Sequence, residues 1–296
     1  MIIRANASIN LAMDVGERNP EGFHAVDLVS VPLDLHDILE VTEMPGSSST
    51  YLLEDDPTII CDETELAYKA FRLMKKEFPI HRGFRIQIYK RIPPEAGLSG
   101  GYADAAGVIK AICKIYRIRL DDPKIASICD QVGAGVMLAM KNVPSRAKGF
   151  TETPEELEDL SLDYGVLLVK PSQGIDTAEI FRQYDRLPEK KRRRADIPAL
   201  IEALRSEDEK AIASHMVNSL LDTGIDMCPQ IEDILTRMKE MGLSMCTMSS
   251  TGPTCFCLSR NRGALRQVRS LFDSLGFGTL LTHTLLPKTR FWTRRK

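Results

Sequence analysis

The sequence predicts a two-domain protein of the α+β class, and three observations support this expectation. Its 296 residues are more than a single domain of about 100–200 residues needs. Segments in which apolar residues alternate are interspersed with segments in which they recur at the helical period. The acidic stretch 151–163 interrupts both patterns and is a suitable boundary. We therefore predict one domain over residues 1–158 and a second over residues 159–296.

The composition excludes several classes of partner. With 43% apolar residues, 27% charged residues and a net charge of −2, the chain has no overall field that would draw it to nucleic acid or to a membrane surface. No apolar run reaches the ~18–20 residues of a membrane span, and the N-terminus lacks the layout of a signal peptide. We expect neither a nucleic-acid nor a membrane partner, and nothing in the composition indicates an oligomeric state.

We expect the seven cysteines to be reduced. Their number is odd and most of them lie among apolar residues, which is typical of buried thiols in a cytoplasmic protein. Cys255 and Cys257 share one face of a predicted strand, but no second Cys or His pair completes a metal site. We therefore expect a cytoplasmic protein without a zinc centre.

The first predicted element is a strand over residues 2–11. One face carries Ile3, Ala5, Ala7, Ile9 and Leu11, and the other carries Arg4, Asn6, Ser8 and Asn10. A polar face of this kind meets either water or a ligand. A strand over 26–33, a turn at 34–37, a further strand from Ile38 and a surface excursion over 44–56 follow. Asp62 and Glu65 predict a capping box for a helix over 66–78.

The stretch Arg91–Ala106 is the most informative part of the first half. An alternating strand with Phe84, Ile86 and Ile88 leads into it, and a helix leads out of it. Between them, glycines leave a loop with little side-chain bulk that opens onto a helix N-terminus, where free backbone N–H groups suit a phosphate. The stretch matches neither the Walker pattern nor Gly-x-Gly-x-x-Gly. A glycine-rich turn without a ligand fits the spacing equally well.

The second half alternates between helices and short strands. A basic run, Lys190–Arg194, indicates a solvated loop, because no aromatic residues are interleaved with it. The predicted elements are a helix at 121–132, a strand at 164–170, helices at 197–205, 208–221 and 229–241, a hairpin over 244–258, an amphipathic helix near 265–272 and a strand at 279–284.

The stretch Arg91–Ala106 resembles the phosphate loop of the GHMP small-molecule kinases, Pro-x-Gly-Ala-Gly-Leu-Gly-Gly-Gly-Ser-Ser-Asp-Ala-Ala. It is most similar to the branch that phosphorylates 4-diphosphocytidyl-2-C-methyl-erythritol in isoprenoid precursor synthesis, and the turn Ser250–Pro253 resembles that branch as well. The resemblance implies a first domain like the second domain of a ribosomal small-subunit protein, a ferredoxin-like second domain, and a ligand cleft between them. It also implies ATP and Mg²⁺ as cofactors.

Carried over by position, the resemblance assigns roles to individual residues. Ser8 stands where the family has a lysine that contacts the phosphoryl groups, and Gly135 stands where it has the aspartate base. Asn10, Phe23, His24 and Thr177 correspond to positions near the cytidine moiety. The cofactor-binding positions are Glu95, Ala96, Gly97, Leu98, Ser99, Gly100, Gly101, Tyr102 and Ala103.

Several of these positions depart from the family. Glu95 replaces a glycine, Tyr102 and Ala103 replace a serine pair, and Gly135 has no side chain to act as a base. The resulting hypothesis is a kinase homologue that still binds a nucleotide-like or cytidylyl small molecule but whose phosphoryl transfer is impaired or lost. Three alternatives remain open: an active kinase in which Asp104, Lys141 or Lys148 substitutes, a non-catalytic paralogue that binds a small molecule or a protein, and a related kinase with another acceptor.

Overall fold

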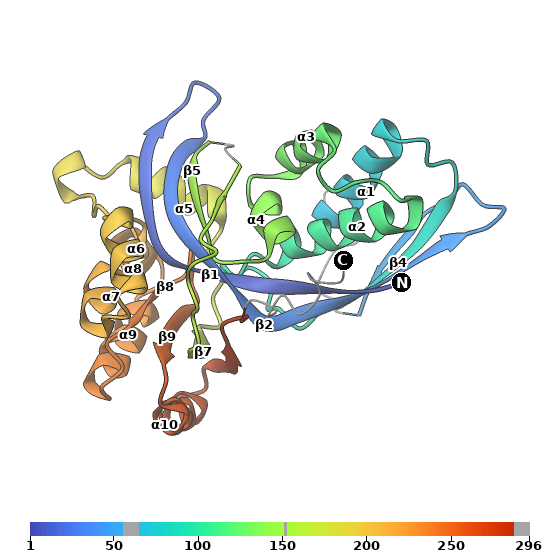
Figure 1. The fold of residues 1–296 in the computed structure, drawn as a ribbon. Coiled ribbons are helices and arrows are strands. Elements are labelled where there is room, and N and C mark those ends of the chain that lie inside the picture. The colour runs from blue at the N-terminus through green and yellow to red at the C-terminus, as the bar shows by residue number, and fades with distance from the viewer. Residues whose placement is uncertain (56–64, 151–152, 287–296) are drawn as a thin grey trace, which may run out of the picture.

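The chain folds into two sheet-and-helix units that share one long, curved ribbon of two strands (Figure 1). The computed structural model describes residues 1–55, 65–150 and 153–286. The predicted two-domain α+β architecture is confirmed. Among the described residues, no helix combines the length and the apolar character that crossing a bilayer requires.

The N-terminal sheet is built around β2. This strand pairs with β1 along one edge, and its other edge pairs with β5 near its start and with β4 near its end. The strands of this sheet are β1 (Ile2–Arg18), β2 (His24–Met44), β3 (Tyr51–Glu54), β4 (Gly83–Tyr89), β5 (Ser145–Gly149) and β6 (Glu155–Glu156). One sequence prediction is wrong here: no turn interrupts β2 at 34–37, because pairing with β1 includes His36 and Asp37 and pairing with β4 begins at Ile38. The predicted excursion at 44–56 lies at the surface over its described residues, 44–55, and it contains a strand that the sequence analysis missed, β3, which pairs with β4 in parallel.

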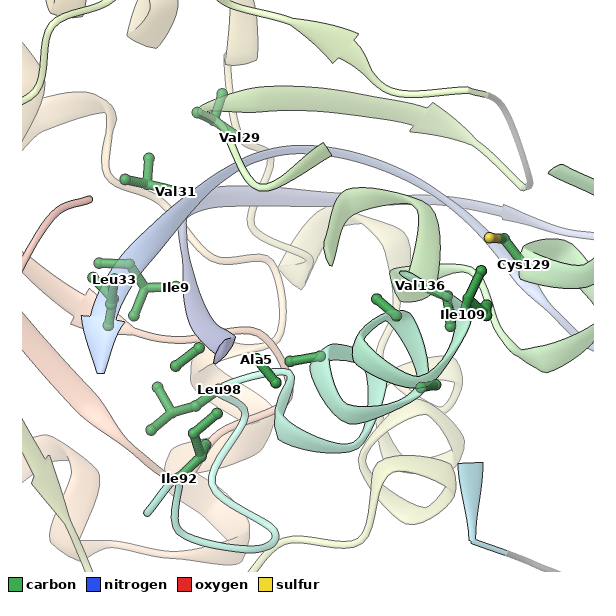
Figure 2. Packing of buried hydrophobic residues seen from close by; sticks show 14 of the residues in the cluster. Ala5, Ile9, Val29, Val31, Leu33, Ile92, Leu98, Ile109, Cys129 and Val136 are labelled. Atoms are coloured by element: carbon green, nitrogen blue, oxygen red, sulfur yellow. The ribbon is translucent and has the colours of Figure 1, made fainter. Parts of the chain in front are cut away.

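The predicted alternation along β1 is confirmed up to residue 9, and beyond it both faces are buried. Ala5, Ala7 and Ile9 are buried, whereas Asn6 and Ser8 are only half-buried. Register shifts near Asn6–Ser8 and Asn10–Ala12 bend the ribbon. Figure 2 shows this inner face, where residues of β1 and β2 pack beside Ile92, Leu98 and Ile109.

Four helices cover the N-terminal sheet: α1 (Leu66–Glu77), α2 (Gly100–Tyr116), α3 (Pro123–Val132) and α4 (Gly135–Lys141) (Figure 1). Helix α2 is the most central, and its apolar stripe of Ala105, Ile109 and Ile112 is fully buried. The N-cap residue of α1 is Glu65, whose carboxylate accepts from the Ala67 N–H. The predicted capping box also involves Asp62, which lies outside the described residues.

The C-terminal sheet has the strand order β10-β7-β9-β8, and all of its neighbouring strands are antiparallel. With helices between β7 and β8 and between β9 and β10, this is the predicted ferredoxin-like arrangement. The strands are β7 (Gly165–Lys170), β8 (Cys246–Met248), β9 (Cys255–Ser259) and β10 (Gly278–His283). The helices are α5 (Thr177–Asp185), the 3₁₀ turn η1 (Glu189–Lys191), α6 (Ile197–Arg205), α7 (Glu209–His215), α8 (Leu221–Met227), α9 (Gln230–Glu240) and α10 (Arg262–Ser274).

The prediction of one helix over 208–221 is wrong, because α7 ends at His215 and α8 begins at Leu221. Between them, the buried Asn218 side chain donates to the carbonyl oxygens of Met248 (2.9 Å) and Ser250 (2.7 Å). These long-range hydrogen bonds hold the segment in a non-helical conformation that local periodicity does not reveal.

The basic run is attached to the fold rather than solvated throughout. Arg193 pairs with Asp222 (2.7 Å) and Arg194 pairs with Asp14 (2.9 Å). The Arg192 guanidinium lies over the Tyr184 ring, 4.8 Å from its centroid. The run therefore connects the β1–β2 ribbon with the helices of the C-terminal domain.

Candidate functional site

The predicted phosphate loop connects β4 with α2 and is held in place by both domains. The Ser8 N–H donates to the Leu98 carbonyl (3.1 Å), and the Ser249 hydroxyl donates to the Gly97 carbonyl (2.8 Å). Gly97 has a φ of +67°, and a Cβ at this position would lie 2.5 Å from the Ser249 carbonyl oxygen. Only glycine therefore permits this approach of the loop to the hairpin of the C-terminal domain.

A pocket of about 420 Å³ lies against this loop, and we call it the loop pocket. Of the predicted cofactor-binding positions, Glu95 to Tyr102 line it, whereas Ala103 is buried behind it. Thr177 and Thr251 line its C-terminal side, with their hydroxyls 3.3 Å apart. The structure thus brings the loop and Thr177 together from opposite domains.

The N-terminus of α2 faces the loop pocket. Ser99 is its N-cap residue, in a left-handed conformation, and no side chain caps the helix. Gly100, Gly101 and Tyr102 in the first turn line the pocket. Open backbone N–H groups at the positive end of a 17-residue helix fit a phosphate group.

Lys90 is a cation at this site that the sequence analysis missed. Its Nζ lies 2.6 Å from Asp104 Oδ2 and 2.7 Å from Asp37 Oδ2, and both carboxylates are fully buried. A Cβ on Gly100 would lie 3.7 Å from the same Nζ, so the ammonium group sits beneath the start of α2. In the sequence, the position of Lys90 directly before the loop could have identified it as a site residue. Its two carboxylate partners are distant in the chain, so no local pattern predicts them.

Burial and pairing act against each other in this cluster. Burial opposes the charge on Lys90, but the two aspartates outweigh it and raise the Lys90 pKa. Burial raises the pKa of Asp104 well above its ordinary value, although Lys90 acts in the opposite direction. The Asp37 carboxylate also accepts from the backbone N–H groups of Arg91 and Ile92. The cluster therefore anchors the start of the loop, and its charged groups pair with one another.

Carboxylates outnumber cations around the loop pocket. Among the described residues that line it, Lys90 is the one Lys or Arg, and the acidic ones are Glu54, Glu65, Glu95 and Asp176. Glu95 has a φ of +49°, and its Oε2 lies 2.5 Å from where a Cβ on Gly174 would be. The backbone of the site fits a phosphate, but its charge balance disfavours a polyanion. In the described part of the chain, no cluster of three potential metal ligands of the His, Cys, Asp or Glu type occurs.

Tyr102 occupies the space beside Gly135. A Cβ on Gly135 would lie 2.4 Å from Tyr102 Cδ2, and a Cβ on Gly133 would lie 2.7 Å from its Cε1. Burial raises the pKa of the Tyr102 hydroxyl. The Tyr102 ring thus fills the space into which a side chain at position 135 would project.

The other predicted site residues lie away from the loop pocket. Ser8 and Asn10 are on β1, and their backbones contact the loop and its hairpin. His24 stacks on Phe181, with ring centroids 5.1 Å apart, and its Nε2 lies 2.8 Å from Asp185 Oδ1. Phe23 is 67% exposed. Neither His24 nor Phe23 lines the loop pocket.

The alternative cations have different surroundings. Lys141 pairs with Glu156 at 2.7 Å, and Lys148 is on β5; neither lines the loop pocket. Six cysteines in the described part of the chain are free and buried, and Cys61 lies outside it. Burial raises the pKa of the Cys255 thiol well above its ordinary value.

A two-domain fold with a glycine-rich loop at the inter-domain pocket and an uncapped helix behind it defines the class of small-molecule kinases to which the sequence motif pointed. The model of the GHMP kinases N terminal domain matches residues 65–149, and that of the GHMP kinases C terminal matches residues 200–274. The chain belongs to the GHMP kinase family.

Within this family, the chain is similar to 4-diphosphocytidyl-2-C-methyl-D-erythritol kinases. It is 32% identical to that of Exiguobacterium sibiricum, over 90% of this chain and 92% of the relative, and 33% identical to that of Clostridium beijerinckii, over 87% and 90%. A crystal structure of 4-(cytidine 5'-diphospho)-2C-methyl-D-erythritol kinase superposes with a TM-score of 0.78 at 26% identity, covering 96% of this chain and all of the other. A mevalonate kinase, at 15% identity and a TM-score of 0.69, shares the fold.

Proposed function

We propose that this chain is a GHMP kinase homologue that binds a nucleotide-like or cytidylyl ligand in the cytoplasm and whose phosphoryl transfer is strongly reduced. The observation that carries the proposal is the contact between Tyr102 and Gly135. The Tyr102 ring fills the space of the missing base, and Ser8 provides no charge in place of a lysine. Losing a general base costs about 10²–10⁴ in rate, and losing one electrostatic donor costs about 10²–10³.

Ligand binding is supported separately by the backbone of the loop. The open N-terminus of α2 and the glycines of the loop pocket present N–H groups rather than side chains, so the replaced side chains do not remove them. ATP would place its phosphates there and would supply the phosphoryl group. For Mg²⁺ the fit is poor, because Asp37 and Asp104 both face Lys90.

A specific observation favours a second candidate, an active kinase with a rebuilt site. Lys90 places a buried ammonium group beneath the first turn of α2, where it could support a phosphate that the family contacts with a lysine at the Ser8 position. The acceptor under this second candidate would be the cytidylyl alcohol of the similar kinases or another small alcohol.

Thermal unfolding with Mg-ATP, CMP and CDP, each added alone, separates the candidates. A ligand at 100 times its Kd raises the stability by about 2.7 kcal/mol. We expect CMP or CDP to stabilise the protein and Mg-ATP to do so weakly, with no measurable ADP release in a coupled assay. Steady ADP release that depends on an added diphosphocytidyl alcohol would establish the active kinase instead.

A further inference from the structure

A second pocket, of about 430 Å³, lies behind the phosphate loop. Pro93 and Leu98 line both this pocket and the loop pocket, so the loop is the wall that separates them. The opposite wall is the β7–β10 strand pair of the C-terminal sheet. We call this space the rear pocket.

Strand register explains why the rear pocket is hollow. Leu168 and Lys170 lie on the same face of β7 because they are two residues apart, and their partners on β10 are Leu280 and Gly278. All four residues line the pocket. A Cβ on Gly278 would have only the Lys170 carbonyl oxygen nearby, at 3.5 Å. Glycine at this position therefore leaves open a space that a larger side chain would fill.

The charged residues that line the rear pocket are positive, whereas most of those that line the loop pocket are negative. Arg91 and Lys170 line it, and no carboxylate does so among the described residues. The Arg91 guanidinium has no partner in the described part of the chain, and Lys170 Nζ has one long contact, 3.5 Å from the Pro171 carbonyl. Two cations that line the same partly apolar hollow favour an anionic ligand.

We propose that the rear pocket binds a small organic phosphate monoester with an apolar group. A dianionic phosphate matches the two cations, and the Arg91 guanidinium can hold two of its oxygens at once. The apolar group packs against Leu98, Leu168 and Leu280. A ligand bound there touches the back of the phosphate loop, and this binding requires no phosphoryl transfer, so the site is independent of the proposed function.

The test measures the Kd of hexyl phosphate for the full chain by isothermal titration calorimetry. We expect one binding site, with R91Q and K170Q each weakening the binding about tenfold or more. Neither side chain takes part in an ion pair among the described residues, so both variants should fold. G278V should also weaken binding because it fills the hollow and leaves both charges in place. The matched control K114Q alters an exposed lysine on α2 outside the pocket and should leave the Kd unchanged.

Three comparisons make the test decisive. Inorganic phosphate and 1-hexanol should each bind more weakly than hexyl phosphate, since each lacks one half of the recognised chemistry. T177V, which alters the loop pocket, should leave the Kd unchanged. The proposal is overturned if R91Q, K170Q and G278V all bind hexyl phosphate as the unaltered protein does, if either half-ligand binds as tightly, or if T177V alone abolishes binding.

Discussion

The aromatic ring of Tyr102 and the missing side chain of Gly135 are two parts of one packing arrangement. The Tyr102 Cδ2 atom lies 2.4 Å from where a Cβ on Gly135 would be, and its Cγ lies 2.8 Å from the same point. Real Cβ atoms do not approach so closely, so position 135 cannot carry a side chain while Tyr102 keeps this conformation. Glycine at position 135 therefore depends on the tyrosine at position 102.

The first prediction concerns the stability of this pair. Gly135→Ala should lower the free energy of unfolding by about 1–3 kcal/mol through overpacking, although alanine in a helix is ordinarily favoured over glycine. Tyr102→Ser should relieve the clash, so the double variant should be more stable than the two single changes predict. Urea unfolding of both single variants and the double variant measures this coupling.

The matched control is Gly278→Ala, where the nearest atom to the new Cβ is at 3.5 Å. It should change stability far less. Additive effects of Gly135→Ala and Tyr102→Ser would contradict the structural link between the two positions.

The second prediction concerns restored catalysis. Combining Ser8→Lys with Gly135→Asp should fail, because the new aspartate meets the Tyr102 ring. Adding Tyr102→Ser makes room, and the triple variant should gain about 10² or more in ADP release with a diphosphocytidyl alcohol. The assay should include the Ser8→Lys, Tyr102→Ser double variant, which lacks a base. If the triple variant releases no more ADP than this double variant, the missing base does not limit the chemistry.

The third prediction concerns Lys90. Lys90→Met leaves Asp37 and Asp104 buried without their cation, which should cost about 3–5 kcal/mol. The raised pKa of Asp104 gives the sign of the pH dependence: the folded state binds the extra proton, so stability falls as pH rises above the unfolded-state value of 3.8. The Lys90→Met variant lacks the opposing effect of Lys90 on the Asp104 pKa, so its stability should fall more steeply as the pH rises. Urea unfolding midpoints of both proteins at pH 4.5 and pH 7 test this: the difference between the two proteins should be larger at pH 7.

The fourth prediction concerns His24. Its side chain is 5% exposed and contacts both Asp185 and Phe181, so His24→Ala should destabilise the protein by about 1–3 kcal/mol. If this residue also serves the ligand, CMP should lose its stabilising effect in the variant. Phe181→Leu, which removes the stacking but keeps His24, separates the two roles: CMP stabilisation that survives in both variants would place the ligand elsewhere.

The fifth prediction concerns pH and the buried Lys110. Burial lowers its pKa to about 8 from 10.5, and its Nζ donates to the Ala139 carbonyl (2.8 Å). Between these values the unfolded state binds more protons, so this residue makes stability rise with pH. Lys110→Met should flatten the rise, and the stability difference between the two proteins should change between pH 8 and 10.5. Parallel curves over that range would show that Lys110 remains solvated.

Much of the fold followed from short-range patterns. Alternation identified β1 and β4, the helical period identified α1, α3 and α9, and Asp122 before Pro123 correctly indicated the start of α3. The glycines of the loop indicated the loop pocket, because a backbone that approaches a ligand or a neighbouring hairpin requires residues without side chains. The missed break at Asn218 and the missed strand β3 both depend on partners that are distant in the chain.

The sequence alone indicated the family and the two-domain fold, because the motifs that carry them are local properties of the chain. Tertiary structure decided which residues share one volume or one charge cluster. Tyr102 and Gly135 are 33 residues apart in number but share one volume, and Lys90 becomes a buried cation only where Asp37 and Asp104 meet it. One side chain excludes another, and buried charges pair, only where the fold brings them together. The spacing of residues along the chain therefore does not predict these contacts.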